Sequence, residues 1–148
     1  MQRTPETIKS VIVADKQSNS FCIALSMLKN TFSKDVITKA LIDSGALINC
    51  FDWGFVTKHK LPCYCLPKPI CAKNIDGSYN EAGIIKFITT MFIRIKGIIH
   101  QVPFHILNCG NENVILGTPW LEKVNLIINW AEHSVDIPNH TDRTPNYN

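Results

Sequence analysis

The segment Ala40–Ala46 places an acid where an apolar run ends. It reads Ala-Leu-Ile-Asp-Ser-Gly-Ala, so Asp43 follows apolar residues and precedes a hydroxyl and two small residues. A carboxylate at the end of a buried strand is penalised by desolvation unless it accepts hydrogen bonds or shares a proton. Ionisable groups in such surroundings gather at functional sites. The pattern favours a chemical role for Asp43, while the commoner role of such an aspartate, capping a turn, stays open.

Carboxylates hydrolyse peptide bonds in pairs. Two of them a few ångströms apart cannot both ionise, so one stays protonated as an acid while the other activates water. Beside Asp43, the small Gly45 lets a substrate backbone approach closely, and the Ser44 hydroxyl can donate a hydrogen bond that fixes the loop. These neighbours suit Asp43 for one half of such a pair.

The elements that position Asp43 are predicted to be strands. Short apolar runs rich in Ile, Val, Phe and Thr recur with a period of two, which favours strands over helices. The predicted fold class is therefore all-β. The expected strands are Phe21–Leu28, Ile37–Ile42, Ile70–Ile75, Ile84–Ile95, Ile98–Leu107, Asn113–Leu116 and Leu126–Trp130, and a last hairpin turns at Glu132–Ser134 into Val135–Ile137.

Two segments interrupt the strand pattern and predict short helices. Asp52 can cap a helix that ends near His59. Thr118 can cap a second helix, with Pro119 at its first position and its end near Asn125. One or two short helices are therefore expected beside the strands.

The length and composition allow one domain. A chain of 148 residues that is 45% hydrophobic and 18% charged can bury one ordinary core. Residues 1–20 are predicted to form a flexible arm, in which Val11–Val13 hints at an edge strand, and residues 139–148 to form a disordered tail. The domain itself is expected to span residues 21–138.

The distribution of charge argues against nucleic-acid and membrane partners. The net charge is only +3, and the basic residues are scattered rather than gathered in a stripe. The most apolar region, Ile84–Ile99, is interrupted by Lys86, Arg94 and Lys96, which would be costly in lipid. The polar stretch Met1–Ser10 lacks the apolar run of a signal peptide, so we expect a cytoplasmic rather than a secreted protein.

The six cysteines do not have the spacing of a metal site. The chain contains no Cys-x-x-Cys pair, and Cys63 and Cys65 are too close for the usual zinc knuckle. Free thiols that act as small apolar residues in a reducing compartment are the favoured interpretation.

Four motifs of the chain occur in a familiar order. They are Ala40–Ala46, Asp76–Ser78 with Gly83, Val114–Leu121, and Ile127–Trp130. In this order and spacing they resemble the catalytic loop, the flap turn, the apolar-apolar-Gly strand with its following helix, and the closing segment of the retropepsin-like aspartic proteases of Gypsy-type LTR retrotransposon Gag-Pol polyproteins. The resemblance covers roughly Phe21–Ile137, and it implies an acid-protease barrel with one lobe per chain.

The resemblance implies a role for each matching residue of the first motif. Asp43 would be the catalytic acid, and Ser44 would form a hydroxyl-to-backbone lock between the paired loops of two subunits. Gly45 and Ala46 would line the cleft. Thr118 departs from the pattern, because the retroviral members carry arginine at that position.

Two further motifs would frame the cleft according to the same resemblance. The flap residues would lie near the tip of a mobile hairpin that closes over the substrate, and the strand residues would pack behind the catalytic loop. The flap residues are Asp76, Gly77 and Ser78, and the supporting strand residues are Ile115, Leu116 and Gly117.

The chain contains a single Asp-Ser-Gly, so one copy holds half of a catalytic pair. A symmetric homodimer is therefore expected, with an extended polypeptide, such as a Gag-Pol-like polyprotein, bound by strand-like pairing. The implied chemistry needs no cofactor and no metal. The expected location is the cytoplasm, including virus-like particles.

Two alternatives remain open. A decayed or host-captured module could keep the dimeric fold for protein interaction without catalysis, although the intact Asp43-Ser44-Gly45 argues against decay. The retropepsin-like domain of ubiquitin-shuttle proteins of the DNA-damage-inducible type is the second alternative, and Pro119–Leu121 with Asn129–Trp130 favours the retrotransposon branch over it.

Overall fold

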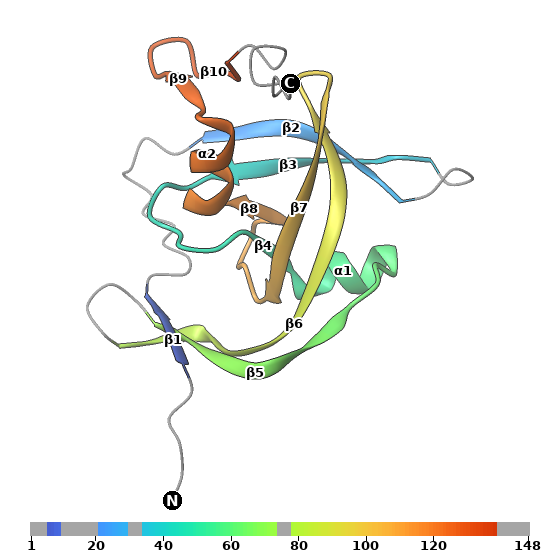
Figure 1. Ribbon diagram of the computed structural model, residues 1–148, viewed down its shortest axis with the longest axis vertical. Helices are drawn as coiled ribbons and strands as arrows, with labels where there is room; N and C mark the ends of the chain where they lie inside the picture. Colours follow the sequence, from blue (N-terminus) through green and yellow to red (C-terminus); the bar gives the residue numbers. More distant parts are fainter. Residues whose placement is uncertain (1–5, 10–20, 30–33, 74–77, 139–148) are drawn as a thin grey trace, which may run out of the picture.

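The computed structural model describes residues 6–9, 21–29, 34–73 and 78–138 (Figure 1). This part of the chain is mostly β. Its strands are β1 (Glu6–Lys9), β2 (Phe21–Leu28), β3 (Val36–Ile42), β4 (Cys50–Asp52), β5 (Tyr64–Lys73), β6 (Tyr79–Ile95), β7 (Ile98–Leu107), β8 (Val114–Leu116), β9 (Ile127–Asn129) and β10 (Ser134–Asp136), and its helices are α1 (Trp53–His59) and α2 (Thr118–Val124). Neither helix is long and apolar enough to cross a membrane.

Six of the strands close into a barrel. The main sheet has the order β1-β5-β6-β2-β3-β8-β4-β7, and β7 also pairs with β6, so the strands from β6 to β7 form a ring. Most neighbours are antiparallel, but β3 pairs with β8 and β4 pairs with β7 in parallel. The hairpin β9–β10 forms a separate two-stranded sheet.

The strands bury two hydrophobic clusters, and β3 and β8 contribute to both. Alternate residues of β3 face opposite ways, because Ala40 and Ile42 belong to the larger cluster and Leu41 belongs to the smaller one. The larger cluster includes the stacked rings of Phe51 and Phe104, whose centroids are 3.8 Å apart. Both faces of β3 are buried at its C-terminal end, and Asp43 follows directly after this buried end.

Both predicted helices are present, but only one begins as expected. Asp52 caps α1 through a side-chain oxygen that accepts from the Gly54 and Phe55 amides, which confirms the prediction. In α2, Thr118 is the first helical residue, and the N-cap position is Gly117, which has no side chain to offer. The prediction that Thr118 caps this helix is wrong, because its hydroxyl points to the loop after Asp43.

Strands β1, β4, β5 and β6 differ from the sequence-based prediction. Residues 1–20 were predicted to be a flexible arm, but Glu6–Lys9 form β1, and β6 begins at Tyr79 instead of Ile84. The three-residue β4 was not predicted, since its register is set by pairing with β7 on one side and β8 on the other. Strand β5 starts at Tyr64 instead of Ile70, because a register shift between Cys65 and Ile70 accommodates Pro67 and Pro69. A short apolar pattern cannot reveal either feature.

The N-terminal segment contributes one strand. Residues Glu6–Lys9 form β1, which runs parallel to β5 and lies at the lower edge of Figure 1. The predicted edge strand at Val11–Val13 and the predicted tail at residues 139–148 lie outside the described residues.

Candidate active site

Asp43 continues the β3–β8 ladder by one residue and then leaves it. Its amide donates to the Leu116 carbonyl (3.1 Å), directly after the pair Ile42 and Leu116. The side chain is only 9% exposed. Its Oδ1 atom accepts a hydrogen bond from the Gly45 amide (2.8 Å). The carboxylate is thus held by its own loop at the end of a buried strand.

The loop after Asp43 is a tight turn secured to α2. The Ala46 amide donates to the Asp43 carbonyl (3.1 Å), which closes the turn. The Ala46 carbonyl in turn accepts from the Thr118 amide (2.9 Å) and from the Thr118 hydroxyl (3.3 Å). Figure 1 shows this loop passing beside the start of α2. Thr118 therefore ties the first helical turn to the acid-bearing loop.

Gly117 makes this contact sterically possible. A Cβ atom at Gly117 would collide with the backbone carbonyl oxygens of Ala46 and Ile48. The Ala46 carbonyl cannot move freely, because it accepts both hydrogen bonds from Thr118. Ile115, Leu116 and Gly117 are fully or almost fully buried behind the loop. The sequence-predicted strand and the predicted catalytic loop are therefore brought together.

Asn49 is an important residue that the sequence analysis did not single out. Its side chain is 4% exposed, and its Oδ1 atom accepts from the Gly117 amide (2.9 Å). Its Nδ2 atom donates to the Pro103 carbonyl (3.4 Å), and its backbone carbonyl accepts from the His105 amide (2.8 Å). Asn49 thus joins the loop, β7 and the entrance of α2. A polar residue between the apolar Ile48 and Cys50 was the signal that could have identified it.

The four predicted residues of the loop differ in exposure. Asp43 and Ala46 are buried, Gly45 is half-buried, and Ser44 is exposed. Leu47 is also exposed, at 46%. The loop therefore presents Ser44 and Leu47 outward while it holds the Asp43 carboxylate close to the core.

The predicted flap lies at the end of the β5–β6 hairpin. Asp76 and Gly77 lie outside the described residues, whereas Ser78 is described and exposed. The pair formed by Lys73 and Tyr79 brackets this turn. Further along β6, Gly83 has a φ of 74° next to the second register shift of the hairpin. A hairpin is thus present where the sequence predicts a flap.

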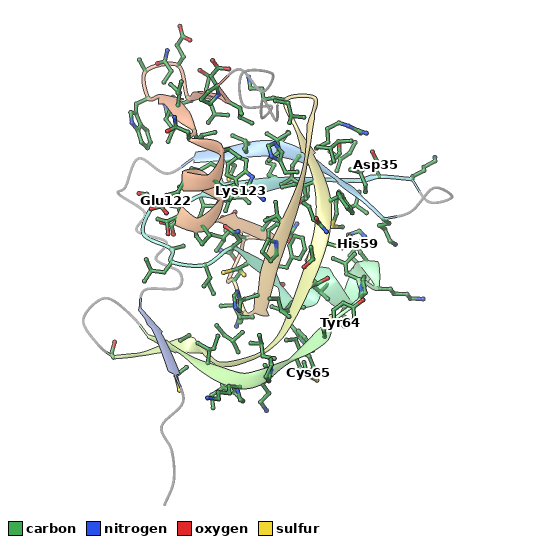
Figure 2. The ribbon with its side chains drawn as sticks, in the orientation of Figure 1. Asp35, His59, Tyr64, Cys65, Glu122 and Lys123 are labelled. Atoms are coloured by element: carbon green, nitrogen blue, oxygen red, sulfur yellow. The ribbon has the colours of Figure 1, made fainter. Side chains whose placement is uncertain are left out.

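Two other carboxylates, Asp35 and Glu112, have structural partners. Asp35 forms an ion pair with Arg94 (3.0 Å), and Glu112 accepts from the Cys22 thiol (3.8 Å). Figure 2 shows Asp35 and the α2 residue Glu122 on opposite sides of the molecule. Within the described ranges, no three His, Cys, Asp or Glu side chains gather as metal ligands would.

Two groups near the loop, the half-buried His105 and the buried Cys109, have shifted pKa values. Burial lowers the pKa of His105, because desolvation disfavours the imidazolium. A hydrogen bond with Cys50, together with burial, raises the pKa of the Cys109 thiol. Cys109 therefore stays a neutral thiol, in agreement with the six cysteines being free.

Comparisons with known proteins agree with this architecture. The family model of the PEG10/RTL1 protease domain matches residues 39–143. The retroviral protease-like domain of Ddi1 from Leishmania major superimposes with a TM-score of 0.54 at 13% identity, over 81% of this chain and 88% of that chain. The EIAV protease complexed with the inhibitor HBY-793 gives a TM-score of 0.52 at 15% identity, over 77% and 95%. No curated protein sequence matches the chain.

These likenesses confirm the predicted fold class. The barrel with two short helices is that of the retroviral protease-like domains. At 13% and 15% sequence identity, the structural matches support the assignment of the fold alone. The finer prediction, an origin in a Gypsy-type Gag-Pol polyprotein, stays a prediction.

Proposed function

Because the chain belongs to the PEG10/RTL1 protease-domain family, we propose that it is a homodimeric aspartic endopeptidase in which two Asp43 side chains activate water. The observation that carries the proposal is the Asp43 carboxylate itself. It is 9% exposed and accepts the Gly45 amide at 2.8 Å. Burial of a carboxylate costs free energy, and acids buried at the end of a strand gather at functional sites.

The proposed reaction needs two such carboxylates that share a proton. The ionised one takes a proton from water while the water oxygen attacks the peptide carbonyl carbon. The protonated one donates its proton to the carbonyl oxygen. When the tetrahedral intermediate breaks down, the amide nitrogen leaves with a proton and the acid pair regains its starting state. Asp43 supplies one of these groups, and a second copy supplies the other.

Dimerisation follows from the number of sites in one chain. Only one Asp-Ser-Gly is present, and two-fold symmetry would place two equal loops face to face. The exposed Ser44 and Leu47 side chains are available for contacts across the axis. The β5–β6 hairpin of each protomer would cover an extended peptide. We propose a Gypsy-type, Gag-Pol-like polyprotein as the substrate and the cytoplasm as the location.

The proposal is tested with the full chain and its Asp43→Asn variant. Peptide mixtures are scanned for cleavage with and without pepstatin, and sedimentation measures the oligomeric state of the same samples. We expect dimers whose pepstatin-sensitive cleavage is lost in Asp43→Asn. Asp35→Asn, which removes only the surface pair with Arg94, should keep its activity.

Two results would count against catalysis by this pair. Cleavage that persists in Asp43→Asn rejects the acid assigned here. A folded dimer that cleaves nothing in the mixtures favours the non-catalytic module that dimerises for protein interaction.

A further inference from the structure

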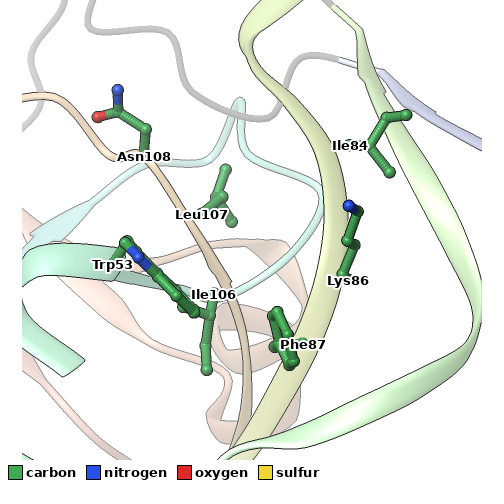
Figure 3. Close-up of a pocket in the computed structure, with 7 residues that line it drawn as sticks. All are labelled: Trp53, Ile84, Lys86, Phe87, Ile106, Leu107 and Asn108. Atoms are coloured by element: carbon green, nitrogen blue, oxygen red, sulfur yellow. The ribbon is translucent and has the colours of Figure 1, made fainter. Parts of the chain in front are cut away.

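A second cavity lies apart from Asp43, between the start of α1, β6 and the end of β7. Its volume is about 280 Å³. None of its lining residues belongs to the loop of Asp43. Figure 3 shows two groups of side chains that face one another across the cavity, one from α1 and β7 and the other from β6. The lining residues are Trp53, Ile84, Lys86, Phe87, Ile106, Leu107 and Asn108.

The walls of this cavity are apolar but face water. The rings of Trp53 and Phe87 lie with their centroids 5.4 Å apart, and the Trp53 side chain is 47% exposed. Ile84, on the same strand as Phe87, is 51% exposed. The floor consists of the buried Ile106 and Leu107. Exposed aromatic and aliphatic side chains around a concave surface are typical of sites that bind an apolar group.

The polar groups at the rim are hydrogen-bond donors. Among the described residues that line the cavity, Lys86 is the only charged one, and it is exposed. The Oδ1 atom of Asn108 already accepts from the Gly110 amide (3.0 Å), so the amide NH₂ is the group that Asn108 can offer a ligand. The rim thus presents an ammonium from β6 and, on the opposite side of the cavity, an NH₂ group after β7, and each of them can donate to a carboxylate.

The acid that precedes Trp53 is bound by backbone amides. Asp52 precedes Trp53, and its two carboxylate oxygens accept three backbone amides. These amides belong to Gly54 (2.9 Å), Phe55 (3.4 Å) and Cys109 (3.0 Å). Both Asp52 oxygens are thus directed at backbone amides, and Asp52 itself does not line the cavity, whereas the Lys86 ammonium does.

We propose that this cavity is a docking site for an acidic peptide segment. An apolar side chain of the peptide packs against Trp53 and Phe87, and an adjacent Asp or Glu carboxylate accepts from Lys86. The volume is at the lower end of the roughly 300–1,000 Å³ of ligand pockets, which suits one or two side chains rather than a large cofactor. Binding here needs no cleavage, so the site is independent of the function proposed for Asp43.

The experiment uses the full chain with Asp43→Asn, so that no probe can be hydrolysed by the proposed pair. The probes are acetyl-Phe-Asp-amide, acetyl-Phe-Asn-amide and acetyl-Phe-Lys-amide. Binding is followed by ¹H–¹⁵N NMR, with the indole N–H of Trp53 as the reporter. We expect the Asp probe to shift this signal saturably and to bind about three- to tenfold more tightly than the Asn probe, with the Lys probe weakest.

Two variants test the proposed contacts. Trp53→Ala should weaken the Asp probe by about tenfold or more, because aromatic anchors carry much of the energy of such sites. Lys86→Met should abolish the preference for Asp over Asn and leave the fold intact, because the ammonium is exposed. Lys68→Met, an exposed lysine of β5 outside the cavity, is the matched control and should change nothing.

Two outcomes would overturn the proposal. Equal affinity for the three probes, or an unchanged preference for Asp over Asn in Lys86→Met, rejects the proposal that the cavity prefers acidic peptides. Shifts that centre on the Asp43 loop instead of Trp53 place the peptide in the cleft and reject the second site. Neither outcome bears on cleavage by Asp43, which is measured separately with the unmodified chain.

Discussion

At the scale of single residues, the buried side-chain amide of Asn49 holds the loop of Asp43 in position. Asn49 accepts from the Gly117 amide and donates to the Pro103 carbonyl. Both partners are backbone groups of segments that lie far away in the sequence. A side chain that satisfies such groups in the interior is difficult to replace, because any smaller residue leaves them without a bond.

We predict that Asn49→Ala destabilises the protein and impairs the site. The unsatisfied Gly117 amide should lower the free energy of unfolding by about 1–3 kcal/mol, measured by urea unfolding. Peptide cleavage should fall as well, since the loop loses one of its connections to the start of α2. Asn113→Ala is the control, because the Asn113 amide bonds the Thr38 hydroxyl at the surface (3.2 Å). Equal losses in both variants would contradict the role of Asn49.

Also at the residue scale, His105 predicts a pH dependence of stability. Burial lowers its pKa below the ordinary value of about 6.5. The unfolded chain therefore binds a proton at a pH where the folded chain does not, and acid favours unfolding. The contribution of His105 to stability is complete above about pH 6.5 and is lost as the pH falls from there toward the folded-state pKa.

Urea unfolding of His105→Gln between pH 5 and pH 8 tests this expectation. The variant should show a flatter dependence of the free energy of unfolding on pH than the natural chain. His133→Gln, which changes an exposed histidine, should retain the natural dependence. A slope that is the same with and without His105 would show that other groups cause it.

At the scale of elements, the site is a crossing of two chain segments. The turn that follows β3 passes over the junction of β8 and α2, and the contact is backbone against backbone at Gly117. The two segments are held at this distance by the Thr118 and Asn49 hydrogen bonds. Strand, turn and helix therefore behave as one unit.

Two glycine substitutions should separate folding from catalysis. Gly117→Ala should destabilise the protein by about 3 kcal/mol or more, because its Cβ collides with two carbonyl oxygens. Gly45→Ala should cost less stability but should reduce cleavage, since its Cβ would lie 3.2 Å from Asp43 Oδ1 and would push the carboxylate aside. Thermal unfolding and peptide cleavage are measured on both. A Gly117→Ala protein as stable as the natural chain would refute the close crossing.

At the scale of the whole molecule, the proposed dimer needs a contact surface between two barrels. The β9–β10 hairpin stands apart from the main sheet at the top of Figure 1. Ile127 and Trp130, at its start and turn, are 53% and 49% exposed. Two large apolar side chains close together on a hairpin are costly in water, and a second copy of the chain would cover them.

We predict that Ile127→Lys weakens the dimer. A buried ammonium would oppose association, so the dimer dissociation constant should rise by about tenfold or more. Sedimentation over a range of concentrations measures this constant. Ile37→Lys is the control, because Ile37 is 77% exposed on β3. If both variants associate like the natural chain, the hairpin is not part of the interface.

The sequence by itself determined the local features of this protein. The period-two runs identified most strands, the Asp52 cap identified α1, and the burial of an acid after Leu41 and Ile42 identified Asp43. Each of these signals lies within a few consecutive residues, where the side-chain period and the capping chemistry act. The motif order was sufficient for the fold class, which the structure confirms.

Only the tertiary structure decided the features that join distant segments. The strand β4 exists because β7 and β8 flank it, Thr118 bonds the Asp43 loop instead of capping α2, and Asn49 bridges to Gly117. The cavity at Trp53 likewise needs α1, β6 and β7 together. Hydrogen bonds and steric contacts depend on distances in space, which a pattern along the chain does not contain.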